Sequence, residues 1–290
     1  MPSSKDNREG KGPLRVVAKG GNGKLRLRIY QVLVLALFFV LWHVLTSPTL
    51  LPPIYFSEAS HAAFFFGEPL QVLGRLWRWF ATGEIYEHLW VTLVETVLSF
   101  FIGTVFGVAF GLWLALSPTA SAILDPYIKA INAMPRVILA PIFFVWFGLG
   151  IASKVALGVS LVFFIVFFNV YQGVREVSPV VLANARMLGA SPRQLLRYVY
   201  VPSAMSWVFA SLHNSVGLAF VGAVVGEYLG SAKGVGYLIH QAEGFFDMNT
   251  VVAGILLLTA FALLLDWLVG VAEKRLMVWQ PRSVETERTW

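Results

Sequence analysis

The chain has 290 residues, of which 57% are hydrophobic and 13% are charged, and its mean hydropathy is +0.71. A soluble domain has about 25% charged residues, so this composition indicates a polytopic helical membrane protein. The long, continuous apolar stretches argue against a β-barrel, and the lack of cysteine excludes disulfides and thiol chemistry. The net charge of +6 is read as a membrane topology signal, and nucleic acid is not expected as a partner.

The chain is expected to begin with a disordered basic tail over residues 1–28, because this segment holds eight Lys and Arg side chains and no apolar periodicity. Residues 29–84 are predicted to form the first span and an outer interfacial segment. The apolar run over 29–45 follows basic residues, as in a signal peptide. It is long, however, and no small-residue cleavage site follows it, so an uncleaved span is favoured.

A short amphipathic helix is predicted around residues 68–80. Its large apolar side chains share one helical face: Leu70, Leu73, Leu76, Trp77 and Phe80. Such a helix lies on the bilayer surface or packs against the spans, and the pattern leaves both open.

Five further apolar blocks follow, and with the first they predict six spans. They cover residues 88–116, 122–148, 155–172, 204–228 and 249–272. The block over 122–148 is broken by Pro135 and Pro141. Residues 85–275 are expected to form the core domain, followed by a C-terminal tail over 276–290.

Lys and Arg are unevenly divided between the two sides of this arrangement. With the N-terminus inside, seventeen lie on the cytoplasmic side and four outside, namely Arg75, Arg78, Lys154 and Lys233. This bias predicts that both termini and the loop over 175–202 are cytoplasmic.

The loop over 175–202 is expected to contain two short helices. Ser178-Pro179 and Ser191-Pro192 are helix-start signals, and Gly189 can end the first helix in a left-handed conformation. Because Val201 precedes Pro202, it is expected to be extended. From these signals alone, an ordinary capped loop whose arginines only follow the membrane topology is the favoured interpretation.

The same loop resembles a signature of ABC importer permeases: Glu-Ala-Ala, three residues, Gly, nine residues, then Ile-x-Leu-Pro. Here the chain reads Ala183-Asn184-Ala185, then Gly189, then Val199-Tyr200-Val201-Pro202. The leading Glu and the first Ala of the signature are absent. The flanking stretches over residues 85–275 are similar to the nitrate, taurine and sulfonate branch of these permeases.

The resemblance implies an all-α type I ABC importer permease fold and a bacterial inner-membrane location. It implies a homodimer, two ATPase subunits and a periplasmic binding protein as partners, with ATP and Mg²⁺ bound by the ATPase and no cofactor on this chain. The loop would be the coupling helix that docks on the ATPase. Its implied contact residues are Ala183, Asn184, Ala185, Gly189, Ala190, Ser191, Pro192, Val199, Val201 and Pro202.

Polar residues inside the apolar blocks are candidates for a translocation path, because charged groups in spans tend to face a water path or the protein interior. These candidates are Glu95, Arg136, Asn214, Glu227 and Asp266. For Glu95 and Asp266, structural pairing inside the bundle is the alternative. Glu227 is expected near water, and Arg136 could attract an anion or anchor the chain at the inner leaflet.

Glycines recur every four residues in two spans, at Gly103, Gly107 and Gly111 and at Gly222 and Gly226. This spacing predicts close packing between helices or between copies of the chain.

The function expected from these observations is a permease subunit that moves a small nitrate-like, taurine-like or sulfonate-like solute, or a related organic acid. The chain lacks the G-x-x-x-x-G-K-[ST] motif of nucleotide binding, and it shows no metal-ligand or nucleophile set, so it is not expected to be an enzyme. A proton-coupled secondary carrier is the alternative. It would need its own coupling relay and usually repeat symmetry, and the sequence shows no internal repeat.

Overall fold

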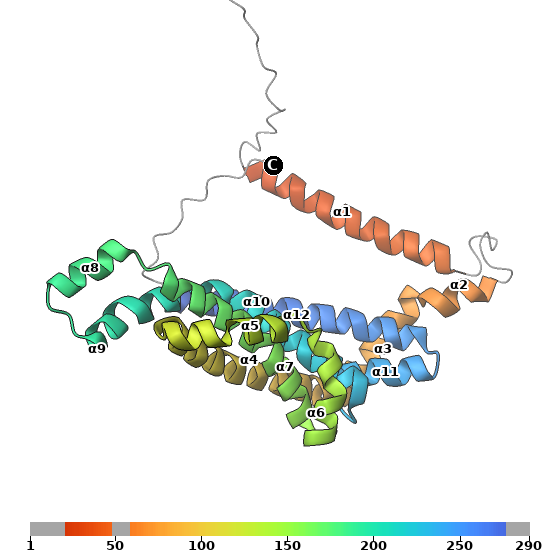
Figure 1. The fold of residues 1–290 in the computed structure, drawn as a ribbon. Helices are drawn as coiled ribbons and strands as arrows, with labels where there is room; N and C mark the ends of the chain where they lie inside the picture. Colours follow the sequence, from red (N-terminus) through yellow and green to blue (C-terminus); the bar gives the residue numbers. More distant parts are fainter. Residues whose placement is uncertain (1–20, 48–58, 277–290) are drawn as a thin grey trace, which may run out of the picture. The chain divides into compact units, whose positions relative to one another are not determined.

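The computed structural model of this protein describes residues 21–47 and 59–276, and all its regular elements within these ranges are helical (Figure 1). The helices are α1 (Gly21–Thr46), α2 (Ala59–Phe66), α3 (Pro69–Thr82), α4 (Glu84–Leu116), α5 (Pro118–Ala133), η1 (Arg136–Leu139), α6 (Ala140–Phe147), α7 (Ile151–Arg175), α8 (Pro179–Met187), α9 (Pro192–Leu195), η2 (Leu196–Tyr200), α10 (Val201–Gly230), α11 (Val235–Gly244) and α12 (Met248–Leu276). The chain from His43 onward forms a structural unit separate from the first part of α1. Of the disordered tail predicted over 1–28, residues 1–20 lie outside the described residues, whereas residues 21–28 are helical and form the start of α1. Of the tail predicted over 276–290, residues 277–290 lie outside the described residues.

Five of these helices are long and apolar enough to cross a membrane, and the bent pair formed by α5 with η1 and α6 would supply a sixth span. The two parts of this pair meet at an angle of 88°. The bend lies at Pro135, whose extended backbone (ψ 105°) ends the α-helical path. The predicted break within the apolar block over 122–148 is therefore confirmed, and the bent pair fits either a broken span or a re-entrant loop.

The core of the second unit is formed by α4, α7 and α10, which pack side by side (Figure 1). Helix α7 carries a valine at every fourth position, and this spacing places the valines on one helical face. The buried cluster consists of Val162, Val166, Val170 and Val174 of α7 with Ala204, Val208 and Ala219 of α10.

The glycines of α4 face the same valines. A Cβ atom added at Gly103 would lie 2.7 Å from Cβ of Val162, and one added at Gly107 would lie 2.8 Å from Cβ of Val166. Such distances are too short for carbon atoms, so only glycine allows α4 and α7 to approach this closely. The predicted packing role of Gly103, Gly107 and Gly111 is confirmed, and the packing lies within one chain.

The short helix α3 packs on α12 at the outer edge of the bundle. Val72 and Trp79 are buried there, and Arg75 forms an ion pair with Asp247 at 2.6 Å. The apolar face predicted for this helix remains exposed, with Leu70 and Trp77 67% and 76% accessible. Helix α3 thus packs against a span with one face and leaves most of its apolar face exposed, although Phe80 contacts the ring of Tyr86.

Candidate functional site

The predicted loop between the spans α7 and α10 is helical and projects beyond the ends of both (Figure 1). Its first helix, α8, begins at Pro179, as the Ser178-Pro179 pair predicts. The side chain of Ser178 makes no capping hydrogen bond, so proline at the first helical position is the feature that fixes the start.

Gly189 ends this first helix in the predicted left-handed conformation, with φ +78°. Its N–H donates to the carbonyl of Arg186 at 2.9 Å, and the N–H of Ala190 donates to the carbonyl of Ala185 at 3.0 Å. These bonds satisfy helix-end carbonyls in the manner of a Schellman motif. A Cβ atom added at Gly189 would meet no atom of this chain within 4 Å. The glycine is therefore required here by its backbone conformation and not by crowding within the chain.

The second helix of the loop starts at Ser191-Pro192 as predicted. The backbone N–H of Gln194 donates to Oγ of Ser191 at 3.3 Å, and the backbone N–H of Ser191 donates to Oε1 of Gln194 at 2.7 Å. This reciprocal pair is a capping box, which fixes the direction in which α9 leaves the turn.

The prediction that Val201 is extended is wrong. Val201 is helical (φ −63°, ψ −47°), and α9 continues without a break into α10. The connection is a π-helical turn over Leu196–Tyr200, in which the N–H of Val201 reaches the carbonyl of Leu196. A π turn widens the helix by one residue, and this adjustment allows Pro202, which has no N–H to donate, to enter the helix.

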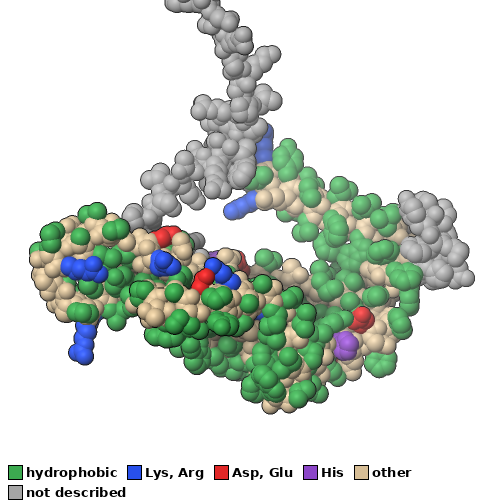
Figure 2. Space-filling model, viewed as in Figure 1, with side chains coloured by type: hydrophobic (Ala, Val, Ile, Leu, Met, Phe, Trp, Pro, Cys, Tyr) green, Lys and Arg blue, Asp and Glu red, His purple; other side chains and the backbone are tan. Residues whose placement is uncertain are grey.

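The tip of the loop presents apolar side chains to the outside. Leu188 and Met187 are 89% and 78% accessible, the largest such exposure near the Gly189 turn. Next to Leu188, Gly189 and Ala190 there is a depression of about 240 Å³, whose far wall includes Leu195. Lys and Arg side chains gather over this end of the structural unit (Figure 2). The loop therefore offers a rigid apolar tip with a basic surround.

The residues that the signature marks lie along this loop and differ in exposure. Ala183, Asn184, Gly189, Ser191, Pro192 and Pro202 are exposed, whereas Ala185, Ala190, Val199 and Val201 are half-buried.

A second polar site lies inside the bundle, where α4, α7 and α10 meet. Glu95, Lys154 and Glu227 are at most 1% accessible. The carboxyl groups of Glu95 and Glu227 are joined by a hydrogen bond. Oε1 of Glu227 also accepts from Oγ1 of Thr92 at 2.6 Å. Nζ of Lys154 donates to the backbone carbonyls of Leu149 and Gly150, just before α7. The cluster brings one amino group close to two carboxyl groups, but Oε2 of Glu95 accepts no hydrogen bond from the described residues.

This cluster corrects two expectations. Glu227 was expected near water and is fully buried, and Lys154 was counted in an outer loop but lies on α7. Lys154 also packs against α10, because a Cβ atom at Gly226 would lie 2.8 Å from its Cγ.

The glycine-rich loop between α10 and α11 folds back onto Glu227. The N–H of Gly236 donates to Oε2 of Glu227 at 2.8 Å, and the N–H of Gly234 donates to Nδ1 of His88 at 3.0 Å. A Cβ atom at Gly234, whose φ is +105°, would lie 2.1 Å from Cδ of Glu227. Sequence reasoning did not find this role, although the alternating glycines after Glu227 carried the signal.

The other path candidates do not join the buried cluster. The guanidinium group of Arg136 lies 4.6 Å from the ring centre of Phe164 and donates to Asn132. Asn214 and Asp266 are exposed, and Asp266 lies 3.5 Å from Nε2 of His213. The structure therefore brings together Glu95 and Glu227, in a way that fits pairing inside the bundle, and leaves the other three apart.

The apolar helical bundle with its bent helix pair and projecting loop defines a polytopic helical membrane protein. The inward-facing methionine ABC transporter MetNI contains a chain with the same fold. It has a TM-score of 0.57 and 20% identity, and the match covers 66% of this chain and 94% of that chain.

The chain belongs to the family described as the binding-protein-dependent transport system inner membrane component, whose family model matches residues 103–278. It is 29% identical to the taurine transport system permease protein TauC of Escherichia coli, covering 84% of this chain and 87% of that protein. It is 31% identical to the riboflavin transport system permease protein RibX of Chloroflexus aurantiacus, covering 82% and 91%. The protein is therefore a multi-pass inner-membrane permease component of a transport system.

Proposed function

We propose that this chain forms the translocation pathway of an ATP-driven importer that moves a small solute from the periplasm to the cytoplasm. Family membership supports the transport role, and similarity to a taurine permease favours a sulfonate-like solute or a related organic acid. Nucleotide hydrolysis belongs to a separate ATPase subunit, which binds ATP and Mg²⁺. This chain itself is not an enzyme and binds no cofactor.

The working assembly contains two copies of this chain, two ATPase subunits and a periplasmic binding protein. The large apolar surface of the described bundle supports a second copy, because much of α4 and α12 is exposed in one protomer. Lipid covers the part of this surface that the partner does not.

Both termini and the α8–α9 loop lie in the cytoplasm. The uneven distribution of Lys and Arg supports this orientation. The burial of Lys154 increases the charge bias that supports this orientation. Of the four basic residues counted on the outer side, only Arg75, Arg78 and Lys233 then remain there.

The observation that carries the coupling role is the exposed tip of the loop at Leu188 and Gly189. The helix that follows this tip continues without a break into α10. A rigid helical element transmits a displacement, whereas a flexible loop would absorb it. We therefore assign the α8–α9 loop as the contact with the ATPase and Leu188 as its central apolar contact.

The test replaces Gly189 with leucine and compares it with the same change at Gly83. Gly83 also ends a helix in the left-handed conformation (φ +80°), and an added Cβ atom there would make only an ordinary contact with Cδ2 of Tyr86 at 3.8 Å, so both changes impose a similar strain of about 1–2 kcal/mol. Only Gly189→Leu should abolish uptake and transport-coupled ATP hydrolysis in proteoliposomes with the complete importer. Normal uptake by Gly189→Leu would contradict the assignment of the loop.

A separate prediction concerns the division of labour. The chain purified alone in detergent should release no phosphate from ATP, because no nucleotide motif is present in its sequence. Turnover that persists through purification to homogeneity would contradict the subunit assignment.

A further inference from the structure

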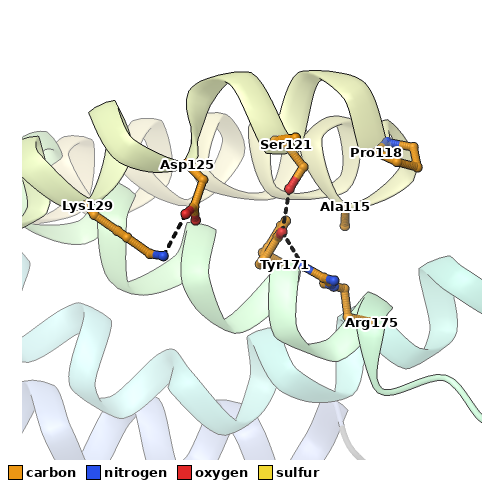
Figure 3. A pocket seen from close by; sticks show the side chains of 8 residues that line it. Ala115, Pro118, Ser121, Asp125, Lys129, Tyr171 and Arg175 are labelled. Atoms are coloured by element: carbon orange, nitrogen blue, oxygen red, sulfur yellow. Dashed lines mark hydrogen bonds and ion pairs between the residues drawn. The ribbon is translucent and has the colours of Figure 1, made fainter.

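A polar depression lies where two spans end, apart from the loop and from the buried cluster. It has a volume of about 610 Å³, and its lining includes Ser121, Asp125 and Lys129 of α5 and Tyr171 and Arg175 of α7. Figure 3 shows these side chains pointing into the same space from the two helices.

The polar groups on one side of this depression form an ordered chain of donors. Nη1 of Arg175 donates to Oη of Tyr171 at 2.6 Å, and Oη of Tyr171 is 2.6 Å from Oγ of Ser121 (Figure 3). Either hydroxyl group can be the donor in the bond between Tyr171 and Ser121. When Tyr171 donates to Ser121, the hydroxyl hydrogen of Ser121 is left for another acceptor.

The charges of the depression sum to an excess of one positive charge. Nζ of Lys129 and Oδ2 of Asp125 form an ion pair at 2.6 Å, so these two charges compensate each other. Glu176, the next residue after Arg175, accepts a hydrogen bond from Gln172. Arg175 therefore retains most of its five N–H donors and has no carboxylate partner among the described residues.

The depression lies beside the ends of two candidate spans. Helix α4 ends at Leu116 and α7 ends at Arg175, and Trp113, one turn before the end of α4, is 51% exposed. Tryptophan at such a position is typical of the head-group layer, and basic pockets between helices at this level accept anionic head groups.

We propose that this depression binds a phosphate-type oxyanion, held by Arg175 and by the hydroxyl group of Ser121. The oxyanion has two possible sources, the head group of an anionic membrane lipid and a free phosphate or sulfonate ion in the adjacent water. Tyr171 acts as a positioning residue, because it orders both donors.

The experiment measures binding to the full-length permease alone, so it is independent of ATPase coupling. In one arm, native mass spectrometry compares retained phosphatidylglycerol with phosphatidylcholine. In the other arm, the melting temperature of delipidated protein is followed as inorganic phosphate or methanesulfonate is added. Arg175→Gln, Arg175→Lys and Tyr171→Phe are compared with wild type.

The matched control is Arg197→Gln. Arg197 is also exposed and lies over a tyrosine ring, with its Cζ 5.8 Å from the ring centre of Tyr198, but it does not line the depression. It removes the same charge from the same end of the bundle.

We expect Arg175→Gln to weaken anion binding about fivefold to tenfold, Arg175→Lys to retain much of it, and Arg197→Gln to match wild type. Selective retention of phosphatidylglycerol would identify the lipid as the source, whereas stabilisation by the free ions alone would identify a soluble oxyanion. Equal effects of Arg175→Gln and Arg197→Gln, or no anion binding in either arm, would overturn the proposal.

Discussion

The buried pair of Glu95 and Glu227 has a defined arrangement of hydrogens. A hydrogen bond between two carboxyl groups needs a proton on one of them. Both oxygens of Glu227 already accept, one from Thr92 and one from Gly236, so Glu95 is the donor. The pair therefore behaves as one acid and one carboxylate, with the positive charge of Lys154 close by.

Glutamine substitutions at these two positions should consequently have unequal effects. Glu95→Gln keeps a donor to Glu227 and should change the free energy of unfolding by less than about 1 kcal/mol. Glu227→Gln replaces one acceptor by an amide that cannot accept, and should cost about 1–3 kcal/mol. Thermal unfolding of the purified variants measures both.

The same two variants also separate a structural role from a path role. If Glu95 only pairs inside the bundle, Glu95→Gln should import solute at the wild-type rate. A larger loss of stability in Glu95→Gln than in Glu227→Gln would show that the proton assignment is incorrect.

At the scale of helices, the contact between α4 and α7 depends on missing side chains. Gly107→Ala places a methyl group 2.8 Å from Cβ of Val166 and should cost about 1–3 kcal/mol through overpacking. The double variant Gly107→Ala/Val166→Ala should recover part of this loss, because the smaller side chain makes room.

The control for this prediction is Gly74→Ala in α3, where an added Cβ atom meets nothing within 4 Å. This change should be neutral or stabilising by up to about 1 kcal/mol, because alanine is the better helix former. Equal stability of Gly107→Ala and Gly74→Ala would argue against close packing of α4 on α7.

The contact of α3 with the start of α12 should depend on pH. Burial raises the pKa of Asp247, but hydrogen bonds from Thr250 and the charge of Arg75 outweigh this effect and leave the pKa below its ordinary value of 3.8. A carboxyl group with a lowered pKa in the folded state stabilises that state above its unfolded pKa, and the contribution disappears as the pH falls through the folded value.

Wild type should therefore be more stable than Asp247→Asn at pH 7, and the difference should stay constant down to about pH 5. Below pH 3.8 the two melting temperatures should converge. A difference that grows on acidification would contradict this account.

For the whole molecule, the absence of cysteine makes the orientation easy to test. A single cysteine at Ser178, in the loop before α8, should react with an impermeant maleimide only after the cells are opened. A cysteine at Ala232, between α10 and α11, should react in cells whose outer membrane alone is permeable. The reverse pattern would invert the proposed topology.

The spans were predictable because each is a long apolar run, and a run of about 20 such residues has few alternatives to crossing a bilayer. The turn at Gly189 was equally clear, because its signals are local. The burial of Glu227 was not predictable, since it depends on residues 234–236 folding back over the end of α10. The unbroken helix at Pro202 was missed because a π turn has no sequence rule of comparable strength.

The helix is unbroken at Pro202, and this continuity has a mechanical consequence. Helix α10 spans 30 residues, roughly 45 Å, with the turn that carries Leu188 before one end and Glu227 near the other. If α10 tilts as one rigid helix, a movement of its cytoplasmic end would also displace its outer end. There it would disturb the pair of Glu95 and Glu227 and the loop over residues 234–236 that covers Glu227. A push at the inner surface and a rearrangement at the outer mouth would then be two ends of one movement.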